Sequence, residues 1–436
     1  MDGRGPLLLR LLRLGLPIAI GRSGVVGMGV VDMIVVGQLR PGELAHQALG
    51  WSLNGPALLG GIGLLLGVQV LAARAVGAGQ VDAAGPIWRR GLVIALVAGA
   101  VVCAVVWLAA GPMLQALGVE PVLARRGAAV AAVLTLAVPA HLAFMASAKL
   151  MEALERPVPG AVVMWVANAV NLALNLAFVP QHGAVGSAWA TVLSRLFLSL
   201  ALPAVMLADP AVRRWGLART AHSGFGYGPL LAIGAAAAAS AVVEAAAFAA
   251  IGVIAARAGG AVPAAIWTIA TGGLVTLAYL LAQGLATAAI VLVSEAVGAG
   301  EPEKAAGVGW TAIAATVVAM AACGAGCVAF APAVAAAFAA AGPVQGALAA
   351  AMGLIALLMI PDGGQGAAEA VLRARGDNWF PTALRFVAFV VVAPLLALRL
   401  AQPGPGAASG VLLAIILVGT AALLAMLARL AWITRR

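Results

Sequence analysis

The chain has 436 residues, of which 64% are hydrophobic and only 9% are charged. No soluble domain of this length buries so much apolar surface, so the composition excludes a soluble enzyme and indicates a protein that crosses a bilayer many times. A formal net charge of +10 also occurs in nucleic-acid-binding proteins. Here the basic residues follow the ends of apolar runs, so we expect a lipid bilayer and no nucleic acid as a partner.

Apolar stretches of membrane length predict twelve transmembrane helices in chain order. The basic and apolar N-terminus resembles a signal peptide but has no small-residue cleavage site, so we expect it to lead into a retained first span. The turn residues 180–183 and 341–343 separate neighbouring spans. The spans are expected near 14–38, 48–72, 91–112, 127–148, 158–180, 184–207, 230–256, 262–293, 307–330, 344–371, 382–399 and 408–430.

The distribution of Lys and Arg predicts that both termini are cytoplasmic. With this orientation the inside segments carry Arg4, Arg10, Arg13, Arg74, Arg89, Arg90, Lys149, Arg156, Arg213, Arg214, Arg219, Lys304, Arg373, Arg375, Arg385, Arg429, Arg435 and Arg436. The outside segments carry only Arg40, Arg125, Arg126, Arg257 and Arg399. Arg22 and Arg195 fall within spans, and Arg22 either reaches a membrane surface or meets an acid on another helix.

Two sequence matches at one spacing indicate that the chain is an internal duplication. The sequence RAVGAG at 74–79 returns as EAVGAG at 295–300, and MEALER at 151–156 corresponds to LRARGD at 372–377. Both matches are offset by 221 residues. We therefore expect an all-α polytopic membrane protein with two six-helix lobes, related by a pseudo-two-fold axis along the membrane normal.

The duplication also predicts the domain boundaries. The N-terminal lobe is expected at 1–208 and the C-terminal lobe at 229–436. A cytoplasmic linker at 209–228 is expected to join them.

A single acid stands in the first span. No other charge lies between Arg22 and Arg40, so Asp32 falls near the middle of the bilayer. A carboxylate there costs roughly 2.5–3.5 kcal/mol on insertion scales. It is either a structural residue bonded to a neighbouring helix or a proton or cation site of a transporter.

Three further acids lie within spans. Glu244 stands alone in span seven, while Asp362 and Glu369 lie two turns apart in span ten. Glu369 is expected to pair with Arg373, four residues on. Asp362 follows Pro361, and we expect an interrupted helix that presents both the carboxylate and carbonyl oxygens to a cation, or a kink needed only for packing.

Polar residues of spans five and six are predicted to surround Asp32. Asn171 and Asn175 share one helix face, and Thr191 begins the next span. Such oxygens suit either Na⁺ or a hydrogen-bonded proton. The sequence contains no HExxH, GxSxG or Walker motif, and its three cysteines lie in apolar runs, so we expect no catalytic residues and no cofactor apart from the coupling ion.

The ordered set of motifs resembles the multidrug and toxic compound extrusion (MATE) transporters, most closely their NorM-type bacterial branch. The set comprises VVDMIVVGQL in span one, ARAVGAG, NLALN followed by GAVGSAWAT, an E-x-x-x-F in span seven, EAVGAG, the pair Asp362 and Gln365, and LRARGD before a proline. The resemblance covers essentially the whole chain. It implies two lobes around a central cavity that opens alternately to each side, and export of cationic compounds in exchange for Na⁺ or H⁺.

By position, the resemblance also implies roles for individual residues. Asp32, Glu244 and Asp362 match the acids that couple to the cation or proton, with Na⁺ expected at Glu244 and Asp362 if Na⁺ is the ion. Asn171, Asn175, Thr191 and Gln365 match supporting polar positions.

The resemblance and the composition leave two alternatives open. One is a lipid-linked oligosaccharide flippase of the same wider superfamily, and the other is an integral membrane enzyme. The favoured interpretation is a monomeric antiporter of cationic small molecules in the bacterial inner membrane.

Overall fold

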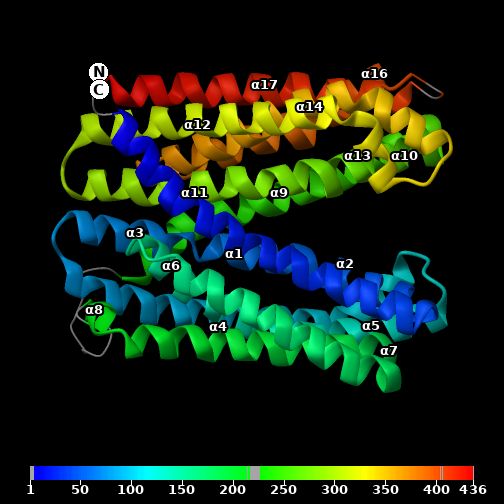
Figure 1. The fold of residues 1–436 in the computed structure, drawn as a ribbon, viewed down its shortest axis with the longest axis horizontal. Coiled ribbons are helices and arrows are strands. Elements are labelled where there is room, and N and C mark those ends of the chain that lie inside the picture. The colour runs from blue at the N-terminus through cyan, green and yellow to red at the C-terminus, as the bar shows by residue number, and fades with distance from the viewer. Residues whose placement is uncertain (1–3, 214, 217–225, 403, 405, 436) are drawn as a thin grey trace. The chain divides into compact units, whose positions relative to one another are not determined.

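The computed structural model describes residues 4–213, 215–216, 226–402, 404 and 406–435, and every regular element in these ranges is helical (Figure 1). The helices are α1 (Arg4–Leu39), α2 (Leu44–Leu64), α3 (Leu66–Gly77), α4 (Ala84–Ala116), α5 (Pro121–Thr135), α6 (Ala137–Ala153), α7 (Val158–Ala208), α8 (Pro210–Arg213), α9 (Tyr227–Gly259), α10 (Ala261–Thr268), α11 (Thr276–Gly298), α12 (Pro302–Ala329), α13 (Ala331–Phe338), α14 (Pro343–Ala374), α15 (Trp379–Arg385), α16 (Ala393–Leu400) and α17 (Ala407–Thr434). Two π-helical segments, Ile269–Val275 and Phe386–Val392, join α10 to α11 and α15 to α16.

Eleven helical stretches of the described chain are long and apolar enough to cross a membrane. The longest, α7, has 51 residues and contains two of the predicted spans. Gly183 separates them with φ 58° and ψ −138°, a conformation that residues with a Cβ rarely adopt. The all-α fold with twelve spans is therefore confirmed.

The observed helices extend beyond most of the predicted spans. The fourth span was expected at 127–148, but α5 and α6 together run from Pro121 to Ala153 with a break at Leu136. Hydropathy reports only the apolar part of a helix, whereas the backbone hydrogen bonds continue into the polar flanks. The short helix α13 was not predicted.

The duplication is visible in the backbone at both sequence matches. Gly79 and Gly300 end their helices with φ of 73° and 72°. In each case the next amide bonds back five residues, from Gln80 N to Ala75 O at 2.8 Å and from Glu301 N to Ala296 O at 2.9 Å. This is the Schellman arrangement that closes a helix with a left-handed residue.

The second match has the same geometry. Arg156 N donates to Met151 O at 2.8 Å, and Asp377 N donates to Leu372 O at 2.9 Å. The left-handed position is occupied by Glu155 in the first half and by a glycine in the second. Helix endings that agree at one offset confirm the predicted internal repeat.

The chain forms two compact units whose limits differ from the predicted lobes. The N-terminal unit is Ile20–Ala241, and the C-terminal unit combines Met1–Ala19 with Val242–Arg436. Helices α1 and α9 are therefore each divided between the two units. Part of the predicted linker, including Arg214 and Arg219, lies outside the described residues, and the division at 209–228 stays a prediction.

Glycines explain why the first part of α1 packs in the C-terminal unit. A Cβ at Gly284 of α11 would lie 2.4 Å from the carbonyl oxygen of Gly15. Leu11 and Leu14 are buried in the same cluster as residues of α11, α12, α14 and α17. Small residues let helix backbones approach closely where lipid supplies no hydrophobic drive to associate.

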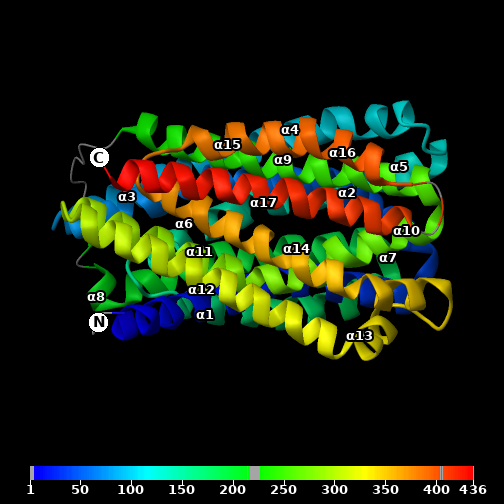
Figure 2. The ribbon, with the colours of Figure 1, turned by 90° about the horizontal axis from the view of Figure 1, so that it is seen from above.

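Helix α14 is central to the C-terminal unit and packs against α11, α12 and α17 (Figures 1 and 2).

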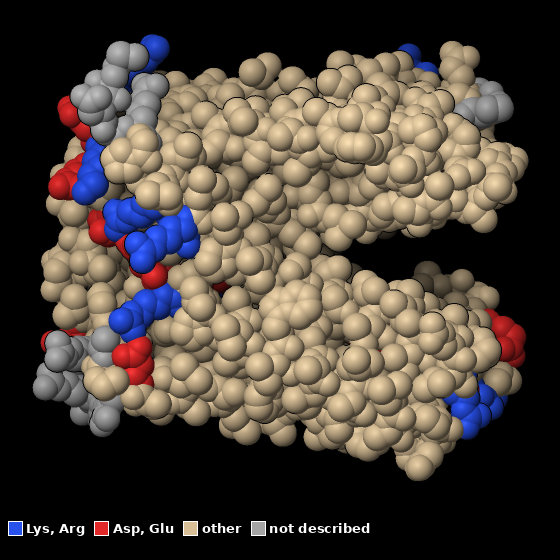
Figure 3. All heavy atoms as spheres, in the orientation of Figure 1, with Lys and Arg blue, Asp and Glu red and all other residues tan. Residues whose placement is uncertain are grey.

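On the face shown in Figure 3, charged side chains gather near the helix ends, and the surface along the middle of the helices is formed by uncharged residues. Three residues counted as inside charges, Lys149, Arg373 and Arg385, are instead buried. They face protein rather than water, so the orientation signal is weaker than the sequence suggested.

Candidate functional site

The first candidate site lies in the N-terminal unit around Asp32 of α1. Its side chain is 1% exposed. Asn175 Nδ2 donates to Asp32 Oδ1 at 2.7 Å, and Thr191 Oγ1 donates to Asp32 Oδ2 at 2.7 Å. The structure therefore brings together the polar cluster that the sequence predicted.

The break in α7 makes this cluster possible. Asn175 and Thr191 are 16 residues apart, which is about 24 Å along an uninterrupted helix. Both reach one carboxylate only because the chain turns back at Gly183. Asn171, one turn before Asn175, is fully buried on the same face, but neither polar atom of its side chain has a hydrogen-bond partner in the described structure.

One basic residue near Asp32 was not recognised as a site residue. Arg195 is 2% exposed, lies one turn after Thr191 and interacts electrostatically with Asp32. Its guanidinium carbon lies 5.4 Å from the centre of the Trp51 ring. The sequence did carry a signal for this residue, because Arg195 is a charged residue within a predicted transmembrane span.

Arg22 meets an acid on another helix, one of the two alternatives left by the sequence. Its guanidinium pairs with Glu152 of α6 at 3.5 Å, and both side chains are largely buried. Glu152 therefore offsets the charge of Arg22, and no ion pair joins Arg22 to Asp32 among the described residues.

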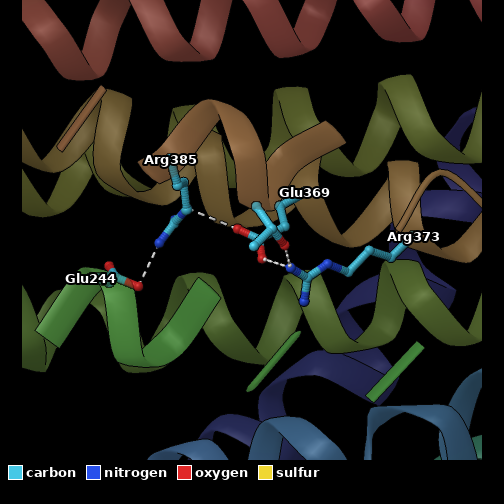
Figure 4. Close-up of polar contacts among 5 residues, drawn as sticks. Glu244, Glu369, Arg373 and Arg385 are labelled. Carbon is cyan, nitrogen blue, oxygen red and sulfur yellow. Dashed lines mark hydrogen bonds and ion pairs between the residues drawn. The ribbon is translucent and has the colours of Figure 1, made fainter. Parts of the chain in front are cut away.

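The second candidate site lies in the C-terminal unit and is a chain of ion pairs (Figure 4). Arg385, at the end of α15, pairs with Glu244 of α9 and, through Nε, with Glu369 Oε2 at 2.9 Å. Glu369 Oε1 accepts a bond from Arg373 at 2.7 Å, which confirms the predicted pair within α14. Sequence analysis placed Arg385 among the cytoplasmic charges although the residue lies inside predicted span eleven.

Asp362 lies on the same face of α14 as Glu369, two turns earlier. It interacts electrostatically with Glu244 and Arg385, but no hydrogen bond or ion pair joins it to another residue in the described part of the chain. Tyr279 of α11 also interacts with these charges, and its hydroxyl lies 2.9 Å from where a Cβ on Gly366 would stand. Nothing in the sequence singled out Tyr279.

The predicted interruption of the helix at Asp362 is wrong. Helix α14 is continuous from Pro343 to Ala374, with Pro361 inside it. A Cβ at Gly363 would lie 2.4 Å from Met320, and one at Gly364 would lie 2.8 Å from Leu423. The glycines therefore serve close helix packing, and Pro361, which has no N–H, leaves only the carbonyl of Leu357 without an intrahelical donor.

Gln365 is buried and packs against α17. Its Nε2 lies 3.2 Å from where a Cβ on Gly419 of α17 would stand, and its Oε1 has no hydrogen-bond partner in the described structure. No hydrogen bond joins Gln365 to Glu244 or Asp362 in the described part of the chain. Among the described residues, no group of three or more His, Cys, Asp or Glu is arranged to bind a metal.

Comparison with known proteins assigns the family. A family model described as MatE matches residues 17–177. A Caulobacter vibrioides protein named "Probable multidrug resistance protein NorM" is 34% identical over 431 residues, covering 95% of this chain and 89% of the relative. The chain belongs to the MATE family. MATE proteins are transporters, so the prediction that this chain is not an enzyme is confirmed.

Other relatives and solved structures agree with this assignment. The multidrug resistance protein NorM of Photobacterium profundum is 28% identical over 214 residues, or 48% of this chain and 47% of the relative. A eukaryotic MATE transporter has the same fold with a TM-score of 0.89 at 20% identity, covering 99% of this chain and 96% of that one. An outward-facing MATE family transporter gives 0.88 at 21% identity, covering 98% and 96%.

Proposed function

We propose that this MATE protein exports cationic or amphipathic small molecules in exchange for Na⁺ or H⁺ by alternating access. The observation that carries the proposal is the Asp32 carboxylate, which is buried and held by two neutral donors, with no direct ion pair among the described residues. The relatives are named as multidrug resistance proteins, which supports a small-molecule cargo.

The surroundings of Asp32 suit a proton or a small cation. Asn175 Oδ1 is buried and has no hydrogen-bond donor in the described structure, so an acceptor oxygen stands beside the carboxylate. A carboxylate kept in an apolar interior is costly unless it is neutralised. Binding of a proton or cation at Asp32 relieves that cost.

Ion binding drives transport only if the ion has different affinities for the two conformations. We propose that Asp32 differs in solvent access between the outward- and inward-facing states, so that its occupancy favours one of them. Glu244 and Asp362 form a second acidic site that attracts a cationic substrate. Antiport follows if the substrate and the coupling ion favour opposite conformations.

The decisive experiment is efflux from proteoliposomes loaded with a fluorescent cationic dye. A Na⁺ gradient and a pH gradient are imposed separately, on wild-type protein and on Asp32→Asn and Glu244→Gln variants. We expect one gradient to drive dye movement in the wild type and the variants to lose it. No movement under either gradient would reject a coupled exporter of such dyes.

We also propose that the protein acts as a monomer in the bacterial inner membrane with both termini in the cytoplasm. Gln80 and Gln402 are exposed at opposite predicted faces. In a variant without native cysteines, Gln80→Cys should resist a membrane-impermeant maleimide in intact cells, whereas Gln402→Cys should react. If Gln80→Cys reacts and Gln402→Cys does not, both termini lie outside the cytoplasm and the predicted topology is wrong.

A lipid-linked oligosaccharide flippase is the second candidate, because Lys149 and Arg195 add buried positive charge to the N-terminal unit. Fold likeness does not separate the two functions. A MOP superfamily transporter from Pyrococcus furiosus, in which the reverse polarity of the binding pocket suggests a different function, has a TM-score of 0.86 at 20% identity, covering 99% of this chain and 98% of that one. Failure of dye efflux together with movement of labelled lipid-linked sugar would favour the flippase.

A further inference from the structure

The acids of the C-terminal unit already have a cation inside the protein. The Arg385 side chain is 5% exposed and contacts Glu244 from one side and Glu369 from the other (Figure 4). Arg373, also buried, occupies the second oxygen of Glu369. Together with Asp362, which interacts electrostatically with Glu244 and Arg385, three carboxylates therefore share their surroundings with two guanidinium groups.

These contacts leave few oxygens for an inorganic ion. A hard cation that leaves water needs several oxygen ligands from the protein. Both oxygens of Glu369 and one oxygen of Glu244 form ion pairs with arginines. Gln365 lies against α17, and Pro361 frees a single carbonyl in the continuous α14, that of Leu357. The residues expected to hold Na⁺ therefore do not fit it.

The positive charge of Arg385 also disfavours Na⁺ binding at Glu244 and Asp362. A guanidinium stays protonated at all physiological pH values, so its positive charge is permanent. A Na⁺ ion placed between Glu244 and Asp362 would lie next to that charge, in a medium that screens poorly. Repulsion from Arg385 would offset much of the attraction of the two acids.

We propose that Arg385 is a built-in counter-cation, tethered where an inorganic ion would otherwise bind, so that Glu244 and Asp362 do not form a Na⁺ site in this chain. If the proposed antiport is correct, the coupling ion then acts on Asp32 alone. This second step rests on the proposed function, while the first is a statement about ion binding and does not.

The test measures ion binding rather than transport. Purified protein is melted in NaCl and in KCl of equal ionic strength, in an Asp32→Asn background that removes the other acidic site. With Arg385 intact we expect equal melting temperatures. Arg385→Gln should create a saturable rise of a few degrees in Na⁺, because a ligand that binds only the folded state stabilises it.

Arg373→Gln is the matched control, because it removes a buried arginine from Glu369 but leaves Arg385 on Glu244. It should show no response to Na⁺. If Arg385→Gln does not fold, the pair Arg385→Gln with Glu369→Gln keeps the charge balance and should gain the same response.

Three results would overturn the proposal. The first is a Na⁺ response with Arg385 intact that Glu244→Gln abolishes. The second is a folded Arg385→Gln variant with no response, and the third is an equal gain in Arg373→Gln. None depends on dye efflux, so a protein that exports no dye can still confirm or reject this proposal.

Discussion

Gly63 and Gly284 are 221 residues apart, and at both positions the backbone of another helix passes within contact of the glycine. A Cβ at Gly63 would lie 2.8 Å from the amide nitrogen of Ala238 in the first part of α9. A Cβ at Gly284 would lie 2.4 Å from the carbonyl oxygen of Gly15 in the first part of α1. The duplication therefore extends to the packing of the helix that opens each half.

Alanine at either glycine should destabilise the fold. The neighbouring atoms are backbone, which moves less readily than a side chain, so we expect Gly63→Ala and Gly284→Ala each to cost about 1–3 kcal/mol. Thermal unfolding in detergent measures the loss. Gly272→Ala is the control, because nothing lies within 4 Å of its Cβ position. Equal stability of all three variants would contradict the packing argument.

Removal of the charge at Asp32 should stop coupled efflux without unfolding the protein. In Asp32→Asn the side-chain oxygen still accepts a bond from Asn175 or Thr191, and the burial cost of a carboxylate disappears. Melting temperature and dye efflux should be measured on the same preparation. Asp82→Asn, at an exposed acid beside α4, should retain full transport. A variant at Asp32 that still couples efflux would show that its role is structural.

Glu369 should contribute more to stability than Glu244. Glutamine at 369 leaves two buried arginines without their shared carboxylate, a change that typically costs about 3–5 kcal/mol. The Glu244 side chain is 29% exposed, so in Glu244→Gln water can solvate part of the arginine that loses its ion pair. Chemical unfolding of Glu369→Gln and Glu244→Gln should therefore rank them in that order. The opposite ranking would mean that the Arg385–Glu244 pair dominates.

Glu120 should make the start of α5 dependent on pH. Its carboxylate accepts bonds from the amides of Val122 and Leu123, both at 3.0 Å, and these bonds lower the pKa of Glu120. A lowered pKa means that the stabilisation is present above the unfolded pKa and is lost as pH falls through the folded one. Hydrogen exchange at Val122 and Leu123 should therefore accelerate in acid. In Glu120→Gln this pH dependence should disappear.

The all-α class, the twelve spans and the repeat follow from the sequence because each depends on a local or periodic property. An apolar run must be helical in lipid, since its amides have no other partners there. The internal repeat can be read from the sequence because similar residues recur at helix ends that are 221 positions apart. Asp32 with Asn175 and Thr191 could be grouped because each polar residue is conspicuous in an apolar span.

Which charges meet across helices was decided by tertiary structure alone. Arg385 follows the end of α14 at Ala374 by eleven residues, yet its partners include Glu244, 141 residues earlier in the chain. Helix rotation and depth, set by packing at glycines, determine whether an arginine faces water or a buried acid. Composition and periodicity identify a polytopic membrane protein, while only three-dimensional contacts show that this chain carries a cation, Arg385, among its acids.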